Sequence, residues 1–403
     1  MQTITAANLN LSEKEIEALR SLTESIRLDP ELSFQEFNAC KRQVEFLKEC
    51  GFAVVTPCYG LDTAYRAEFS SGKGTPVFAF CSEYDALPGV GHGCGHHLIC
   101  GASLAAALHV KHVLEEYQLD GKVVILGCPG EETEGGKVEM AERGALDGID
   151  ALMMAHPTGG TAVICGEYSG VCSAEVTFTA EKAGSPVARC ANPEFTNPLD
   201  AQVLLYQSVA LRRHYMPFDS AISGCIPDGG VRANMIPSQT KSVYTLRSSD
   251  IELLKSLGEM FRDMAKGAAL MTGTQVDVRL SMRHQPTLPA LILRDEYLDN
   301  MDALGFKTPD LRRVYYGAAG TDFGNFSRLR PGVHGHFPLG QIVAAHTLEF
   351  AELSASESAY TAMFSTAKAM ALTALKYLRD PEFRRNVNDS FAQSIKPVNS
   401  GND

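Results

Sequence analysis

The sequence CSEYDALPGVGHGCGHHLICG, residues 81–101, decides the fold class and holds the first candidate ligands. Apolar runs at 76–81 and 98–110 flank it, so we expect a buried strand, a loop and a helix. In the loop, Cys94 and His96 suit a borderline-soft divalent metal, and the glycines between them let both side chains face one point. Open α/β sheets bind ligands here, after the carboxyl end of a strand. A redox or structural cysteine in a flexible turn is the alternative at this point.

The composition limits the classes of function. The chain has 403 residues, 45% of them hydrophobic, so two or three domains are expected. A formal net charge of -12 argues against nucleic-acid and anionic-membrane partners, which favour basic proteins. No apolar run approaches the ~20 residues of a membrane-spanning helix, and residues 1–15 do not resemble a secretory signal. Eleven cysteines at irregular spacing fit a reduced, cytoplasmic protein.

The alternation of predicted elements indicates two domains. Strand-like and helical segments alternate up to residue 155, which predicts an α/β layer fold with a mixed or parallel sheet. Beyond Gly170 the order becomes strand, helix, strand, strand, helix, strand, the βαββαβ signature of a ferredoxin-like domain. We therefore predict a larger domain in two segments, 1–170 and 286–385, interrupted by a small domain at 171–285. The polar stretch 386–403 is predicted to be a flexible tail.

Acidic and histidine side chains follow two further predicted strands. Glu131 and Glu132 come just after one buried run, and His156 comes directly after the next. Because strand ends gather at one edge of a sheet, we expect these side chains near Cys94 and His96.

Together with His346, these residues supply the parts of a two-metal hydrolytic site. Such a site needs ligands for both ions, a shared ligand, and a free carboxylate that takes a proton from water. Each residue also has a plainer explanation. Glu131 and Glu132 could be solvated, His156 could end a strand, and Asp85 could belong to an ordinary turn. Their joint occurrence in one chain favours the metal site.

Several motifs in consistent order carry a resemblance to a known family. They are Glu-Tyr-Asp-Ala-Leu-Pro (83–88), Gly-His-Gly-Cys-Gly-His (91–96), Gly-Glu-Glu (130–132), His-Pro (156–157), Thr-Asp-Phe-Gly-Asn (321–325) and His-Thr-Leu-Glu-Phe (346–350). With Asp-Pro-Glu-Leu-Ser-Phe-Gln-Glu (29–36), they resemble the aminoacylase and carboxypeptidase-G-type metallopeptidase superfamily. The chain is most similar to the branch of p-aminobenzoyl-glutamate hydrolases, β-alanyl-lysine-type dipeptidases and auxin-conjugate hydrolases.

The resemblance implies a mixed-sheet α/β/α catalytic domain and an inserted ferredoxin-like lid domain that commonly dimerises. It also implies two divalent metal ions per chain, and the donor types suit zinc, with manganese or cobalt as alternatives. The implied ligands are Cys94 as the bridge, His96 and His156 at one metal, and Glu132 and His346 at the other. Glu131 is the implied general base, and Asp85 would orient a ligand histidine.

The lid segment departs from the family pattern. The family places a histidine there that supports the tetrahedral oxyanion, and in this chain Ser185 stands at that position. Loss of one such donor typically costs about 10²–10³ in rate. Arg189 could supply a replacement charge, or Ser185, which we predict to contact the substrate, could supply a weaker hydrogen bond. Asn234 matches a lid asparagine that contacts substrate, and Arg232 or Arg247 could pair with a substrate carboxylate.

Three functions are consistent with these residues. The first, which we expect, is a metal-dependent amidohydrolase or dipeptidase that cleaves a small-molecule N-acyl amino acid or dipeptide, as a cytoplasmic homodimer. The second uses the same metal site for another reaction, such as amide bond formation in specialised biosynthesis. The third is a weakly active or non-catalytic homologue. Both alternatives rest on the serine at the lid position. Motifs of serine hydrolases, P-loop proteins and dinucleotide-binding proteins are absent from the sequence.

Overall fold

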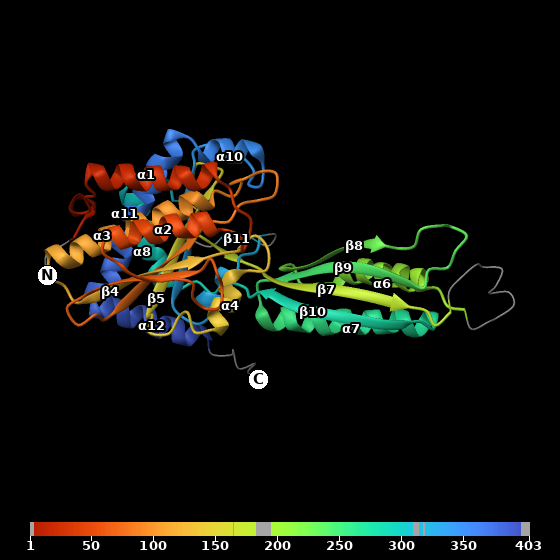
Figure 1. Cartoon of the computed structure of the whole chain (residues 1–403). Helices are drawn as coiled ribbons and strands as arrows, with labels where there is room; N and C mark the ends of the chain where they lie inside the picture. The colour runs from red at the N-terminus through yellow and green to blue at the C-terminus, as the bar shows by residue number, and fades with distance from the viewer. Residues whose placement is uncertain (1–3, 164, 183–194, 309–313, 317–318, 396–403) are drawn as a thin grey trace, which may run out of the picture. The chain divides into compact units, whose positions relative to one another are not determined.

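A computed structural model describes the chain except for residues 1–3, 164, 183–194, 309–313, 317–318 and 396–403. The chain divides into two compact units, which are drawn in Figure 1. The first unit consists of Met1–Glu167, Leu288–Tyr315 and Asp322–Asp403, and the second of Tyr168–Thr287 and Tyr316–Thr321. The sequence predicts boundaries after residues 170 and 285, whereas the structure divides after Glu167 and Thr287. The sequence does not predict that the short stretch 316–321 groups with the second unit.

A six-stranded mixed sheet forms the centre of the first unit, as the sequence predicts. Its strand order is β1-β2-β4-β3-β5-β12, with β4, β3, β5 and β12 parallel and β1 and β2 antiparallel to their neighbours. The strands are β1 (Ala53–Val55), β2 (Tyr65–Ser71), β3 (Val77–Glu83), β4 (Gly121–Cys128), β5 (Ala151–Thr158) and β12 (Gly332–Pro338). The sequence does not predict β12, because glycines and histidines interrupt its apolar pattern, yet the strand is buried throughout.

Helices cover both faces of this sheet. The helices of the first unit are η1 (Ala6–Asn8), α1 (Glu13–Leu28), α2 (Phe37–Glu49), α3 (His96–Glu116), α4 (Gly136–Glu142), α8 (Leu291–Ala303), α9 (Phe323–Ser327), α10 (Leu348–Ser354), α11 (Glu357–Arg379) and α12 (Pro381–Ile395). Alternate residues of β3 serve the two faces. Phe78 and Phe80 join the core formed with α3 and α11, whereas Ala79 and Cys81 join the core formed with α4 and α9. This two-sided burial explains why β3 is apolar along its whole length.

Helix α3 lies at the middle of the larger core. By length and composition it would pass for a membrane-spanning helix, but 89% of its most apolar window is buried inside the protein. It contacts β3, β4 and β5 on one side, and α1 and α11 pack against it on the other. Burial on all sides is the arrangement of a core helix, and it fixes the first residue of α3, His96, at the end of the sheet.

The second unit is a four-stranded antiparallel sheet with two helices. Its elements follow the predicted order: β7 (Gly170–Thr179), α6 (Pro198–Arg212), β8 (Ser220–Asp228), β9 (Gln239–Ser248), α7 (Ile251–Thr272) and β10 (Gln275–His284), with η2 (Arg213–Tyr215) after α6. The strand order is β10-β7-β9-β8, so β8 and β10 are the edges. Both helices pack on the sheet and on each other. The βαββαβ prediction is confirmed. A small two-stranded sheet, β6 (Gly166–Tyr168) with β11 (Val314–Tyr316), completes the strands.

The prediction of a flexible tail is wrong for residues 386–395, which belong to α12. Asp380 begins this helix by accepting hydrogen bonds from the backbone nitrogens of Glu382 and Phe383, both at 3.0 Å. Val387 and Phe391, one helical turn apart, are buried. Two apolar residues at this spacing in a polar stretch are enough to hold the helix against α8 and α11, although they are too few to give a clear helical pattern in the sequence.

We therefore predict that Phe391→Ala destabilises the first unit. Removing this buried ring should lower the free energy of unfolding by about 3 kcal/mol, measured by urea denaturation. Gln393→Ala, on the exposed side of the same helix, is the control and should change it by less than about 0.5 kcal/mol. Equal stability of the two variants would show that α12 is not packed in solution.

Candidate metal centre

The loop between β3 and α3 brings the first candidate ligands together. Gly95 precedes the helix with a φ of 77°, in the left-handed region that favours glycine. A Cβ atom there would lie 2.6 Å from Cγ of Pro157, so no larger residue fits without a shift. The glycine therefore allows a sharp turn between Cys94 and His96, and both side chains are buried.

Asp85 holds the imidazole of His96 in place. Its Oδ1 atom lies 2.8 Å from Nδ1 of His96, while Oδ2 accepts hydrogen bonds from the Ser33 hydroxyl at 2.8 Å and the Glu132 backbone nitrogen at 3.0 Å. Burial alone would raise the pKa of Asp85, but the facing His96 outweighs it and lowers the pKa to about 2. Asp85 is therefore a carboxylate that fixes the Nδ1–H tautomer of His96 and presents Nε2 to the centre, the orienting role that the resemblance implies.

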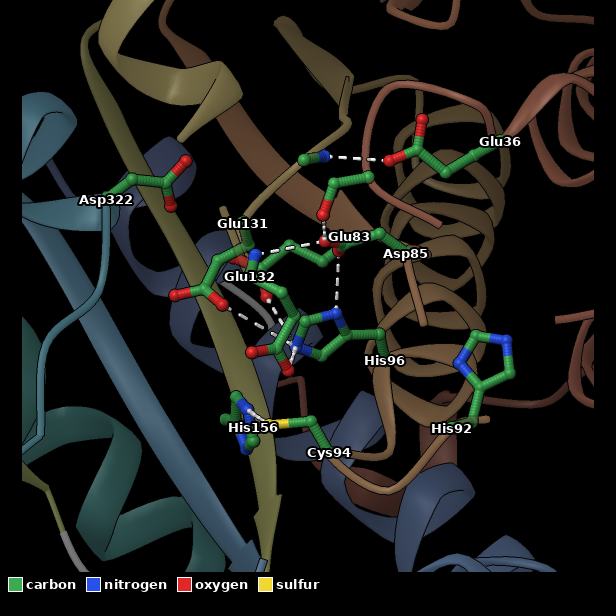
Figure 2. A network of polar contacts seen from close by, with 12 residues as sticks. Glu36, Glu83, Asp85, His92, Cys94, His96, Glu131, Glu132, His156 and Asp322 are labelled. Carbon is green, nitrogen blue, oxygen red and sulfur yellow. Dashed lines mark hydrogen bonds and ion pairs between the residues drawn. The ribbon is translucent and has the colours of Figure 1, made fainter. Parts of the chain in front are cut away.

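Three carboxylates surround the Nε2 atom of His96. Glu83 Oε2, Glu132 Oε1 and Glu131 Oε2 lie 3.7, 3.8 and 3.9 Å from it, as the converging side chains in Figure 2 show. His96 Nε2, Glu83 Oε2 and Glu132 Oε1 are buried, yet none makes a hydrogen bond to another described residue. Buried polar atoms without partners are costly and rare. A cation among them would remove this cost.

Cys94 stands between two groups of possible ligands. Its Sγ atom lies 3.3 Å from Nε2 of His156. The ligand atoms of Cys94, His96 and His156 lie within 4.8 Å of one another, as do those of Cys94, Glu132 and His346. Because the cysteine belongs to both groups, it occupies the position of a bridge. Burial raises the pKa of the Cys94 thiol to about 12, so its thiolate form needs a bound cation.

His156 lies within β5 rather than after it, which corrects the sequence prediction. The strand continues to Thr158 because β12 pairs with it in parallel, with His336 beside His156. The Nδ1 atom of His156 lies 2.7 Å from the Pro157 carbonyl oxygen, which leaves Nε2 directed at Cys94. Burial, and then the charge of His96, lowers the pKa of His156 well below its usual value, so this imidazole is neutral and can act as a ligand.

His346 reaches the centre on an unusual backbone. Its φ is 66°, in the left-handed region, and its nitrogen donates a 2.8 Å hydrogen bond to the Gly93 carbonyl oxygen. Nε2 of His346 lies 3.5 Å from Oε1 of Glu132, and the side chain is 55% exposed. A non-glycine residue at positive φ costs free energy and is found preferentially at functional sites. This conformation holds the exposed imidazole beside Glu132.

A buried lysine that the sequence analysis missed balances part of this negative charge. Lys137 Nζ lies 2.5 Å from Oε1 of Glu83 and 2.6 Å from Oδ1 of Asp322, and all three side chains are buried. Its backbone nitrogen also donates to Asp322 at 2.9 Å. Burial, and then the charges of Glu83 and Asp322, raises the pKa of Glu131 well above its usual value. The sequence around Lys137 does not indicate that this residue is buried, because a lysine in a short helix is normally solvated.

Other candidates lie away from this cluster or outside the described residues. His92, which lies apart from Cys94 in Figure 2, contacts the Ile26 carbonyl oxygen at 3.2 Å through Nε2. Arg232 and Asn234 are exposed in the turn after β8, in the second unit. Half-buried Arg247 is on β9, in the same unit. The predicted substrate residue Ser185 and its neighbour Arg189 fall in the undescribed stretch 183–194.

Thiol, imidazole and carboxylate donors around the free carboxylate of Glu131 are the parts of a metal-dependent hydrolase. Comparison with known proteins agrees. Residues 79–369 match the model of peptidase family M20/M25/M40. The mouse Xaa-Arg dipeptidase is 35% identical over 389 residues, which cover 93% of this chain and 89% of the relative. The human Xaa-Arg dipeptidase is 34% identical over 397 residues, which cover 94% of this chain and 90% of the relative.

The chain therefore belongs to peptidase family M20/M25/M40 and is an enzyme of this peptidase and amidohydrolase family. The fold agrees with a solved Bacillus subtilis structure, the YXEP protein, described as a dinuclear metal-binding peptidase of the M20 family. The TM-score is 0.69 at 20% identity, over 91% of this chain and 99% of the other.

We predict that Lys137→Met strongly destabilises the first unit. The substitution leaves Glu83 and Asp322 as buried carboxylates without their cation, which should cost about 3–5 kcal/mol in unfolding free energy. Chemical denaturation of the metal-loaded protein measures it. Adding Glu83→Gln and Asp322→Asn to Lys137→Met removes the uncompensated charge and should recover part of the loss. If the single substitution is neutral, the buried triad does not persist in solution.

Proposed function

We propose that this protein is a two-metal amidohydrolase that cleaves dipeptides or N-acyl amino acids. The observation that carries the proposal is the convergence of five ligand side chains around one further carboxylate, Glu131, in a chain of this family. Cys94 would bridge the ions, His96 and His156 would complete one site, and Glu132 and His346 the other. The unpartnered buried atoms of His96 and Glu132 fit such ions. The mixture of thiol, imidazole and carboxylate favours zinc, with manganese or cobalt as alternatives.

Bound metal ions would polarise the scissile carbonyl group and make a water molecule acidic enough to act as nucleophile. Glu131 then takes a proton from that water and later delivers it to the leaving amine. Both glutamates approach Nε2 of His96, but Glu132 also lies 3.5 Å from Nε2 of His346 and is the candidate ligand, which leaves Glu131 as the further carboxylate for this role. Asp85 keeps the His96 ring fixed during the reaction.

The substrate class follows from the relatives. Because two relatives that cover most of this chain are Xaa-Arg dipeptidases, we propose dipeptides with a basic second residue as the first substrates to assay. In the second unit, Arg247 is a candidate partner for the substrate carboxylate, since its Nη1 atom has no hydrogen bond to another described residue. Burial of Arg247 and, secondly, the charge of Arg283 lower the pKa of its guanidinium group. Arg232 and Asn234, in an exposed turn, are further candidates for substrate contacts.

Hydrolysis should depend on Glu131. We predict that Glu131→Gln lowers kcat by about 10²–10⁴ while the protein still binds two metal ions, because glutamine keeps the shape but cannot take the proton. Metal content and turnover of Xaa-Arg dipeptides and N-acyl amino acids should be measured on the same preparation. Removal of the metals with a chelator should abolish activity, and re-addition should restore it.

Two other outcomes would favour the alternatives. A wild-type protein that binds two metals but hydrolyses nothing until Ser185→His is introduced would point to another reaction, such as amide bond formation. A protein that binds metal but stays inactive with either serine or histidine at this position would be a non-catalytic homologue. Retention of full activity by Glu131→Gln would contradict the assignment of the base.

We further propose that the protein works as a homodimer through the second unit, in the cytoplasm. None of the described cysteines forms a disulfide bond, which supports a reducing compartment. Strand β8 is a sheet edge, and neighbouring apolar side chains are exposed, including Tyr206 (42%), Tyr215 (72%) and Phe218, which is fully exposed. Exposed edges and apolar clusters are typical of surfaces that bind another chain.

Light scattering during size exclusion tests the dimer. The wild type should elute at about twice its chain mass of 43.6 kDa, and Tyr206→Glu combined with Phe218→Glu should weaken or abolish the dimer by burying charge in an apolar contact. Leu270→Glu, which charges another exposed apolar position, on α7, is the control and should stay dimeric. A monomeric wild type at working concentration would refute the assignment.

A further inference from the structure

The segment Glu31–Glu36, part of the motif 29–36, has no role in the proposed reaction, yet it is attached to both loops of the candidate metal centre. Its backbone runs beside the loop after β3, where Leu32 pairs in parallel with Ala86 and the Ala86 nitrogen donates to the Glu31 carbonyl oxygen at 2.8 Å. The next residue, Ser33, donates its hydroxyl hydrogen to Oδ2 of Asp85 at 2.8 Å. One end of the segment thus holds the carboxylate that orients His96.

The other end of the segment holds the turn that precedes Glu131. Glu36 is fully buried, and its Oε1 atom accepts hydrogen bonds from the backbone nitrogens of Phe34 at 2.9 Å and Gly130 at 2.8 Å. Its Oε2 atom accepts the Thr63 hydroxyl at 2.9 Å. In Figure 2 a dashed line joins Glu36 to the backbone close to Glu131. One carboxyl group therefore ties the N-terminal segment to the loop that carries the candidate base.

Packing reinforces these hydrogen bonds. Gly130 has a φ of 71°, and a Cβ atom there would lie 2.5 Å from Cζ of Phe34. Phe34 itself has a φ of 62°, an uncommon value for an aromatic residue. Its ring lies against the glycine, and its nitrogen shares Oε1 of Glu36 with the Gly130 nitrogen. Oε1 of Glu36 thus accepts hydrogen bonds from both residues of this contact.

We propose that Ser33 and Glu36 are positioning residues of the metal centre, with Ser33 acting through Asp85 and Glu36 acting through the Gly130 turn. The inference rests on the proposed function for what the centre does, but its geometry concerns only how the centre is held. Neither residue touches the candidate ligands His96, Cys94 or His156 in any contact that the described residues show. Their effect must pass through the loops.

What the turn requires of Glu36 is an acceptor rather than a charge. Burial, and then the charge of Asp85, raises the pKa of Glu36 to about 7, so a neutral carboxyl already fits this pocket near neutral pH. In that form Oε1 still accepts from both backbone nitrogens, while Oε2–H can donate to the Thr63 hydroxyl, which accepts as well as donates. Glutamine offers the same pattern, with its amide group toward Thr63. Leucine has a similar size and no acceptor.

The test compares Glu36→Gln with Glu36→Leu in the full-length, metal-loaded protein. For Glu36→Leu we expect a loss of kcat of about 10–100-fold and faster release of metal to a chelator by a similar factor, the usual effect of removing an outer support of a metal site. KM should change little, because the substrate does not touch Glu36. For Glu36→Gln both quantities should stay within about threefold of the wild type, since the acceptor is kept. Ser33→Ala should release metal about fivefold faster, through the hydrogen bond lost from Asp85.

Controls separate positioning from general stability. Leu375→Ala, a buried substitution on α11, lowers the melting temperature by leaving a cavity and should not change the rate of metal release from the folded protein. If Glu36→Leu does not fold, the rates of metal release from the single variants Ser33→Ala and Glu36→Gln still test the inference. The inference is overturned if Glu36→Gln is as damaged as Glu36→Leu, or if Glu36→Leu and Ser33→Ala both release metal at the wild-type rate.

Metal release needs no substrate, so the two proposals can fail separately. A wild type that holds two metals but hydrolyses no amide would refute the proposed function. The rates of metal release from the variants would still test whether Ser33 and Glu36 position the metal centre. Normal hydrolysis with unchanged release rates in all variants would refute only the positioning role. A wild type without bound metal would overturn both.

Discussion

Negative charge that cannot be solvated is the constraint on which the first unit depends. Glu83 and Asp85, at and just after the end of β3, and Asp322, directly before α9, are fully buried, and Glu131 and Glu132 lie near Glu83 around His96. Among the described side chains in direct contact with them, Lys137 is bound to Glu83 and Asp322, and the imidazole of His96 lies 2.8 Å from Asp85. Since isolated buried charges are very unfavourable, further cations bound among these carboxylates would stabilise the arrangement. This is the physical basis of the proposed metal centre.

The fold keeps these charged side chains apart from the apolar core. The parallel strands β3, β4 and β5 are apolar on both faces and end at one edge. The candidate groups Cys94, Glu131 and Glu132 come just beyond that edge, in loops that contain glycine. Helix α3 is buried almost completely, so the position of His96 follows from the packing of the entire core. Of the candidate ligands, His96 and His156 belong to regular elements, Cys94 and Glu132 lie in the loops that follow β3 and β4, and the side chain of His346 is 55% exposed.

Much of this could be predicted from the sequence, and the failures share a cause. Cys94, His96, Glu131 and His346 lie in short motifs with local signals, and the βαββαβ order follows from periodicity. Lys137 lies in no such motif, and the motif 29–36 gives no sign of what Glu36 binds, because the burial of both residues depends on partners far away in the chain. Strand β12 was missed for a related reason, since its glycines and histidines become a strand only beside β5. Patterns along a chain predict elements well, whereas they do not predict which charged residues will meet inside a protein.

The interrupted order of the first unit has a consequence for synthesis. Cys94, His96 and His156 all precede residue 168, so one group of candidate ligands is present once the first segment has left the ribosome. The other group needs His346, and the charge of Lys137 is balanced fully only by Asp322, both of which follow the inserted unit. A nascent chain therefore carries an incomplete centre until its last quarter has been translated and has folded back. The order of the segments delays the assembly of a centre that could attack amide bonds until the protein itself is finished.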